Sequence, residues 1–183
     1  MKNLKIHLAV FLACTTLSFL IFMTIYAAVQ QDLRQNANDP QIQIAEHAAV
    51  ALESGQQIPS LDVSVDIGKS LSPFVIIYDE FGKVLTSNGV LDDKVPVPPL
   101  GVLENAKIKG ENRVTWQPSI NVRIAAVVTH FSGKQSGFVL AGRSLREVEK
   151  REDQTFKFAA AGWLLSVFVL TIAFAIFHIF SKK

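Results

Sequence analysis

Near its C-terminus the chain carries an apolar stretch, Phe158 to Phe180, that contains no charged side chain. Its length matches the roughly 20 residues that a helix needs to cross the hydrocarbon core of a bilayer. Because lipid offers the backbone no hydrogen-bond partners, such a stretch must satisfy its own peptide groups, as a helix does. A second apolar stretch, Leu8 to Val29, follows the N-terminus. The sequence therefore predicts two transmembrane helices, over residues 8–29 and 158–180.

The charged residues are distributed unevenly around these two stretches. All 16 Asp and Glu residues lie between the stretches. Four lysines flank the stretches on their other sides: Lys2, Lys5, Lys182 and Lys183. Positive charge in short flanking segments is typical of the cytoplasmic side of a membrane. We therefore expect a two-pass protein of the inner (plasma) membrane, with residues 1–7 and 181–183 in the cytoplasm and residues 30–157 forming an extracytoplasmic domain.

The segment between the spans has no motif of an enzyme or of a nucleic-acid-binding protein. The formal net charge of the chain is only +2, without a basic patch, so we expect no nucleic-acid partner. The sequence has no glycine-rich phosphate loop, nucleophile elbow or zinc-protease motif. Its single cysteine, Cys14, lies in the first span, and the two histidines of the domain, His47 and His130, have no neighbouring metal ligands. We expect neither catalysis nor a metal or other cofactor.

The first part of the domain predicts a helix over residues 40–54. Asp39 is a natural N-cap before Pro40, and Gly55 suits the end of a helix. Four apolar residues are spaced as on one face of a helix: Ile42, Ala45, Ala49 and Leu52. This stripe either packs on its own domain or meets a second copy of the chain in a homodimer.

The rest of the domain alternates between strand and helix patterns. Segments rich in β-branched and aromatic residues predict five strands: 74–78, 83–86, 113–117, 122–129 and 137–142. A short helix is expected over 100–108, and an exit helix over 143–157 leads into the second span. This order predicts an α+β fold, with a five-stranded antiparallel sheet and flanking helices, between two transmembrane helices.

Three segments carry a resemblance to a known family: VIIYDEFGKVLTSNG, NRVTWQPSINVRIAAVV and GFVLAGRSLREVEKRE. Together they resemble the PAS-like sensory domains, of the PDC and Cache type, of bacterial membrane-bound sensor histidine kinases. The resemblance covers most of the chain, including both spans, and it implies a PAS-like sheet. In that family a HAMP-type linker, a phosphoacceptor histidine and an ATP-binding domain follow the second span. We expect the present chain, which lacks these parts, to correspond to the sensor half.

The resemblance also implies a candidate site for a small-molecule ligand. In the resembled domains, small ligands bind between the sheet and the loops and short helix that cover it. Trp116, Arg123 and His130, which lie on or beside the middle strands, are the candidate residues. The guanidinium of Arg123 is suited to a bidentate pair with a carboxylate. The alternative is that Trp116 belongs to the core and that Arg123 faces water.

Two functions are compatible with the sequence. One is a membrane-anchored, sensor-like signalling module without a catalytic domain, which couples the extracytoplasmic domain to the membrane and to a partner protein such as a histidine kinase. The other is a structural or assembly subunit whose outer domain docks a protein partner. In the second span, Gly162 and Ser166 lie four residues apart, a spacing of small residues that permits close helix packing. This face either serves a homodimer or carries small residues that are incidental in an alanine-rich span.

Overall fold

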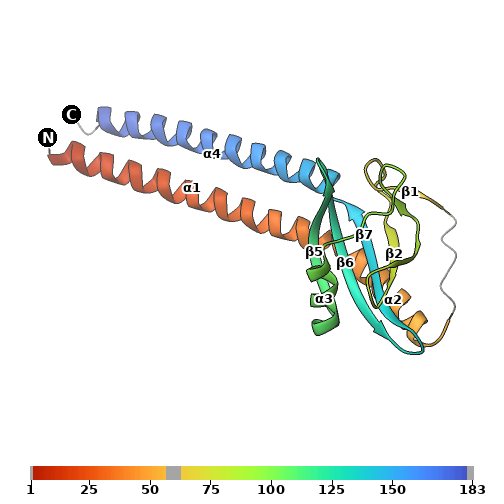
Figure 1. Cartoon of the computed structure of the whole chain (residues 1–183). Helices are drawn as coiled ribbons and strands as arrows, with labels where there is room; N and C mark the ends of the chain where they lie inside the picture. The colour runs from red at the N-terminus through yellow and green to blue at the C-terminus, as the bar shows by residue number, and fades with distance from the viewer. Residues whose placement is uncertain (1, 57–62, 181–183) are drawn as a thin grey trace. The chain divides into compact units, whose positions relative to one another are not determined.

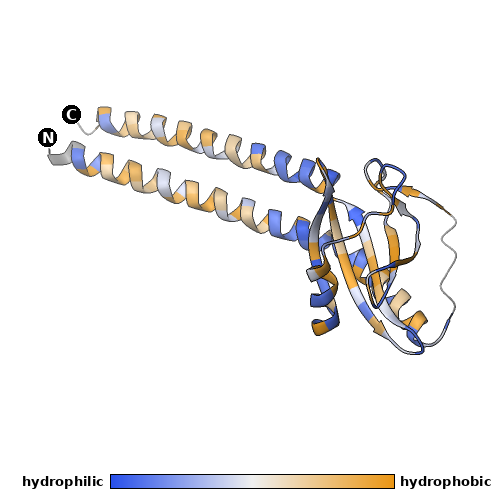
Figure 2. Ribbon diagram, in the orientation of Figure 1, coloured by the Kyte–Doolittle hydropathy of each residue, from blue (hydrophilic) through white to orange (hydrophobic). Residues whose placement is uncertain are grey.

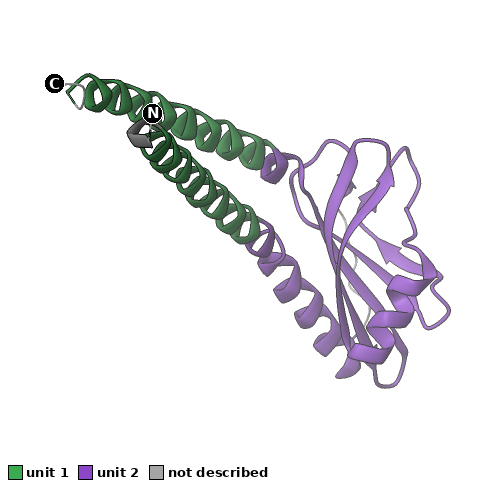
Figure 3. Ribbon diagram, turned by 90° about the vertical axis from the view of Figure 1, so that its left-hand side faces the viewer, with its two compact units in different colours: residues 1–33, 150–183 green, residues 34–149 purple. Residues whose placement is uncertain are grey.

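The structure is a computed structural model that describes residues 2–56 and 63–180 (Figure 1). The chain forms two compact units, one made by residues 1–33 with 150–183 and the other by residues 34–149 (Figure 3). The first unit is helical, and the second contains the sheet.

The helical unit contains most of the two longest helices, α1 (Lys2–Asn36) and α4 (Arg146–Phe180). Both helices are hydrophobic over most of their length and carry hydrophilic residues toward their ends (Figure 2). Each is long and apolar enough to cross a membrane, as the sequence predicts.

A turn at Ala37 and Asn38 separates α1 from α2 (Asp39–Glu53). Pro40 has no N–H group with which to continue the hydrogen-bond ladder of α1, so the helix cannot run on unbroken. The amide of Asn38 donates instead to the carbonyl oxygen of Gln35, at 2.9 Å. Asn38 thereby takes the N-cap position, and Asp39, the expected N-cap, is the first helical residue. The positive φ of Gly55, +83°, follows the end of α2.

The second unit is built on a five-stranded antiparallel sheet in the order β3-β2-β7-β6-β5. Its strands are β2 (Phe74–Asp79), β3 (Val84–Ser87), β5 (Glu111–Ser119), β6 (Val122–Ser132) and β7 (Ser136–Ser144). Helix α3 (Leu100–Lys109) lies in the connection between β3 and β5. The predicted α+β class, with a five-stranded antiparallel sheet and flanking helices, is confirmed.

Two details of the chain differ from the sequence-based expectation. A two-stranded parallel ladder joins β1 (Val65–Asp66) to β4 (Gly89–Val90), and strands this short leave no pattern in a sequence. Strand β7 also continues to Ser144, which pairs with Ile124 of β6. Helix α4 therefore begins at Arg146, three residues after the expected start of the exit helix, and the Arg146 amide donates to the Ser144 hydroxyl at 3.3 Å.

Each face of the sheet has its own apolar core. On one face, Leu103 and Ala106 of α3 pack with Trp116 and with inward-facing residues of β2, β6 and β7. On the other face, α2 packs on a cluster of five sheet residues: Ile77, Val127, Phe131, Val139 and Ala141. Because both faces are covered, five consecutive residues of β6, Ile124 to Val128, are all buried even though their side chains alternate between the faces.

A third, smaller cluster lies where the chain enters and leaves this unit. Ala37, from the turn before α2, is buried with Ala125 of β6 and with Leu145, which follows β7. Val148 of α4 packs against them. The two connections of the domain therefore meet at a single place on β6.

Candidate functional site

A groove of about 600 Å³ runs beside α2 at the end of β6. Helix α2 contributes a stripe formed by Glu46, Ala49, Val50 and Glu53. Strand β6 contributes Thr129 and His130. The other lining residues are His47, Ala51, Ser54 and Gln56. The groove is large enough for a small organic molecule.

Thr129 and His130 both carry buried polar atoms in this region. The hydroxyl oxygen of Thr129 and Nε2 of His130 have no hydrogen-bond partner among the described residues. Strand alternation places Thr129 on the α2 face, two residues from Val127 and Phe131. The same alternation turns the His130 ring to the opposite face, where its centroid lies 5.2 Å from that of Phe138. Thr129 is therefore the β6 side chain that faces α2 in the groove.

One end of the groove is fixed by contacts between α2 and the turn after β6. A carboxylate oxygen of Glu53 accepts a hydrogen bond from the Ser132 amide at 3.1 Å. A side chain at Gly133 would meet the carbonyl oxygen of Glu53 at 2.8 Å, so only glycine fits there without a shift. The position of the Glu53 carboxylate is thereby set by the backbone of β6.

The three residues expected to form a ligand site lie in different surroundings. Trp116 is buried in the core on the α3 face. The Arg123 guanidinium forms an ion pair with Glu149 at 2.5 Å, and both side chains are partly exposed. His130 lies seven residues beyond Arg123 on β6, which is about 23 Å along the strand and on the other face. The structure does not bring the three together. Of them, only His130 borders the groove beside α2, and its ring lies on the other face of the sheet.

The residues on which the groove depends were missed by sequence reasoning. The stripe of Ile42, Ala45, Ala49 and Leu52 was considered, and the structure packs these residues on the sheet of their own chain. A signal for the adjacent stripe was present, because Glu46, Val50 and Glu53 also share one helix face. Thr129 gave no signal of its own, since its burial depends on where α2 lies over the sheet.

Shifted pKa values are found in this unit for Glu80, Asp66 and Tyr78. The ion pair with Lys107, at 2.6 Å, lowers the pKa of Glu80 and joins the β2–β3 turn to α3. A hydrogen bond from Lys69 lowers the pKa of the exposed Asp66 carboxyl. Burial raises the pKa of Tyr78, whose hydroxyl donates to the Pro96 carbonyl oxygen at 3.2 Å. At neutral pH the two carboxyls are charged and the phenol is neutral.

In the helical unit, Gly162 and Ser166 lie on the side of α4 that contacts α1. The hydroxyl oxygens of Ser166 and Ser18 are 2.6 Å apart. Because Ser166 also donates to the carbonyl oxygen of Trp163, Ser18 is the donor to Ser166. A Cβ atom on Gly162 would lie 2.6 Å from the ring of Phe22. The small residues of α4 thus allow close packing between two helices of the same chain.

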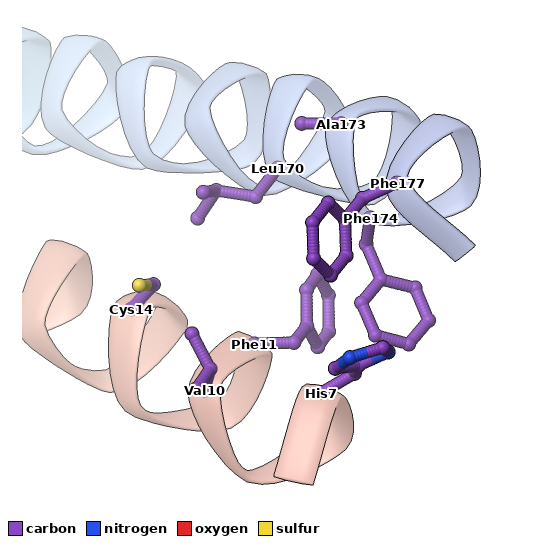
Figure 4. A pocket seen from close by; sticks show the side chains of 8 residues that line it. All are labelled: His7, Val10, Phe11, Cys14, Leu170, Ala173, Phe174 and Phe177. Carbon is purple, nitrogen blue, oxygen red and sulfur yellow. The ribbon is translucent and has the colours of Figure 1, made fainter. Parts of the chain in front are cut away.

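An apolar cavity of about 320 Å³ lies between the beginning of α1 and the end of α4 (Figure 4). Phe11, Phe174 and Phe177 gather beside His7, whose ring centroid is 4.8 Å from that of Phe177. Val10, Cys14, Leu170 and Ala173 complete the lining. The His7 Nδ1 atom is buried without a hydrogen-bond partner among the described residues. The cavity therefore offers an apolar surface with a single imidazole.

Comparison of the chain with models of known protein families, with curated proteins and with solved structures finds no match.

Proposed function

We propose that this protein is a membrane-anchored, sensor-like signalling module with a PAS-like extracytoplasmic domain and no catalytic domain. In this proposal α1 and α4 cross the membrane, both termini lie in the cytoplasm, and the domain passes its conformational state to the spans and to a partner protein such as a histidine kinase. Support comes from the two apolar helices, from the five-stranded sheet between them and from the lysines that flank the spans.

The observation that carries the proposal is the shared cluster of Ala37, Ala125, Leu145 and Val148. Both connections of the domain pack on Ala125 of β6, so a shift of this strand would displace both of them. Thr129 lies four residues further along β6 on the same face, about 13 Å away, and lines the groove. Strand β6 thus contributes Thr129 to the groove and Ala125 to the cluster where the chain enters and leaves the domain. This arrangement suits a domain that transmits binding to the spans.

A disulfide between the two spans tests this coupling. Cysteines replace Ser18 and Ser166 in a Cys14→Ala background, and the rate of their oxidation is measured in membranes. We expect Leu145→Ala, in the junction cluster, to change this rate several-fold. The matched control is Leu103→Ala, which removes another buried leucine, on the α3 side of the sheet.

Equal rates in the Leu145→Ala variant and the unchanged domain, with both proteins folded, would overturn the coupling. A change of the same size in the Leu103→Ala control would also count against it, because general destabilisation would then explain the effect.

A second candidate function, an assembly subunit that docks a protein partner, is favoured by one observation. Phe81 is 89% exposed in the β2–β3 turn, and Leu100 is 67% exposed at the start of α3. Gly82 brings the turn close to Leu100 and Leu103. Large apolar side chains exposed together are typical of a docking surface. Constitutive co-purification with one partner complex, lost in Phe81→Ser, would support this function.

A further inference from the structure

Gln41, in the first turn of α2, is a polar residue that the fold buries completely. Its side chain is 0% exposed, and neither its amide nitrogen nor its amide oxygen has a hydrogen-bond partner among the described residues. Most buried polar groups in proteins are paired, because an unpaired group has lost its hydrogen bonds to water without replacement. The amide of Gln41 therefore destabilises the position in which α2 lies on the sheet, which we call the closed position.

The C-terminal end of α2 is held on the sheet by specific contacts. The Glu53 carboxylate accepts a hydrogen bond from the Ser132 amide at 3.1 Å. The chain at Gly133 comes so close that a Cβ atom there would lie 2.8 Å from the carbonyl oxygen of Glu53. Leu52 is buried in the same cluster as Phe131. This end of the helix therefore has a defined position on the sheet.

The beginning of α2 has no hydrogen bond to the sheet among the described residues. Its buried side chains are Gln41 and Ala45, so an unpaired amide and a single methyl group lie at the centre of the contact. Ile42 and Ile44 beside them are only partly buried. The N-cap residue, Asn38, forms no side-chain hydrogen bond to the first turn. This half of the helix therefore resists displacement less than the C-terminal half.

We propose that α2 pivots about its Glu53 end, and that Gln41 keeps this motion accessible by destabilising the closed position. In the open position the first turns of α2 lift from β6 and β7, and water satisfies both polar atoms of the Gln41 amide. Gln41 and Glu53 are twelve residues apart, about 18 Å along the helix, so a small tilt at Glu53 becomes a displacement of several ångströms at Gln41.

The moving end of α2 is the end that adjoins the junction of the domain. Ala37, four residues before Gln41, is buried with Ala125 and Leu145. When Gln41 lifts from the sheet, it draws Ala37 out of this cluster. The inference deepens the proposed function by naming the element that moves, and it rests on the proposed function only for what the motion signals.

Hydrogen exchange of the full chain in detergent tests the pivot. Exchange rates, corrected for intrinsic differences, are compared between the first half of α2 (residues 42–47), its second half (residues 48–53) and β6. In the unaltered protein we expect the first half to exchange about tenfold faster than the second half, because the pivot opens it without unfolding the sheet. This comparison holds whether or not any variant folds.

Substitutions at two glutamines of α2 isolate the role of the buried amide. Gln41→Met replaces the amide with an apolar group of similar length. It should raise the midpoint of thermal unfolding of the domain by about 4 °C and slow exchange in the first half of α2 about tenfold relative to β6. Gln43→Met is the matched control, because Gln43 is exposed on the same helix, and it should change neither quantity. Gln41→Leu repeats the test with a second apolar side chain.

Several results would overturn the pivot. One is a first half of α2 that exchanges as slowly as β6 in the unaltered protein. Another is a folded Gln41→Met or Gln41→Leu variant in which exchange of this segment is not slowed. Equal slowing in α2 and in the sheet, or an equal effect of Gln43→Met, would show general stabilisation instead. The disulfide test of coupling between the domain and the spans is independent of these results, because it does not alter Gln41.

Discussion

The hydroxyl oxygens of Ser18 in α1 and Ser166 in α4 lie 2.6 Å apart, so a hydrogen bond joins the two apolar helices. Close beside this bond, Phe19 meets Trp163 with ring centroids 5.5 Å apart, and Phe22 covers Gly162. The serine pair is therefore a polar contact between the facing sides of α1 and α4, of the kind that stabilises pairs of apolar helices.

Removing the serine pair should weaken the helical unit modestly. Ser18→Ala is expected to cost about 0.6 kcal/mol, the average value for a hydrogen bond between membrane helices. The measurement is the midpoint of thermal unfolding in detergent. Thr171→Ala provides the control, because the Thr171 hydroxyl donates to the carbonyl oxygen of Val167 in its own helix. An equal shift in both variants would contradict a role for the link between the helices.

Adding a methyl group at Gly162 should be more damaging. Gly162→Ala places a Cβ atom 2.6 Å from the ring of Phe22, and overpacking of this kind costs about 1–3 kcal/mol. Phe22→Ala in the same chain should restore part of the loss, because it removes the clashing ring. Unfolding of the two single variants and the double variant measures the coupling. Additive effects would show that the two residues are not in contact.

A homodimer through the expected faces would have to compete with packing inside the chain. Gly162 is covered by Phe22, and Ala45 is fully buried against the sheet. With Cys14 replaced by alanine, Gly162→Cys should therefore give little disulfide between copies in membranes. Efficient crosslinking of Gly162→Cys, under conditions that also crosslink a known dimer, would show that the copies pair through α4.

The expected topology has a direct test in cells. Protease added to intact spheroplasts should digest the domain and spare tags placed at both termini, because we propose that only the domain lies outside the cytoplasm. A cytoplasmic protein serves as the control for intact membranes. A domain that resists the protease until the cells are lysed would reverse this orientation.

The ion pair between Glu80 and Lys107 predicts a dependence of stability on pH. Lys107 lowers the pKa of Glu80 below its ordinary value of 4.5, so the folded state binds this proton less readily than the unfolded state. The stabilisation is therefore complete above pH 4.5 and is lost as the pH falls through the lowered pKa.

We expect Lys107→Gln to lower the melting temperature slightly at neutral pH. At a pH below the lowered pKa of Glu80 it should have no effect, because the carboxyl is then protonated in both proteins. Lys69 lowers the pKa of Asp66 in the same direction. The Lys107→Gln substitution leaves this pair intact, so Asp66 contributes equally to the pH dependence of both proteins. A difference in melting temperature that grows as the pH falls would contradict the assignment.

The sheet could be predicted because its signals are local. The strands around Ile76 and Val127 are rich in β-branched residues, and each spans enough residues to show a pattern. The sequence also marks the break before α2, because Pro40 lacks the amide that would continue a helix, and α2 begins at Asp39. The ladder of β1 and β4 has only two residues in each strand.

The candidate site was harder to predict because it depends on partners distant in sequence. Arg123 was a candidate ligand-binding residue, with exposure to water as the alternative, and its guanidinium pairs with Glu149, 26 residues away. Trp116 is in the core, which is the alternative that the sequence left open. The groove exists because α2 covers only part of one face of the sheet, and no short sequence pattern records that placement.

The meeting of Ala37 and Leu145 on Ala125 has a consequence for how the protein is assembled. A domain whose two chain ends lie together can be inserted between two neighbouring segments without stretching either of them. The sheet unit is thus a cassette within a helical hairpin. Replacing residues 38–144 with a short flexible loop should leave a hairpin of α1 and α4, and the same cassette could be transplanted into the turn of an unrelated helical pair.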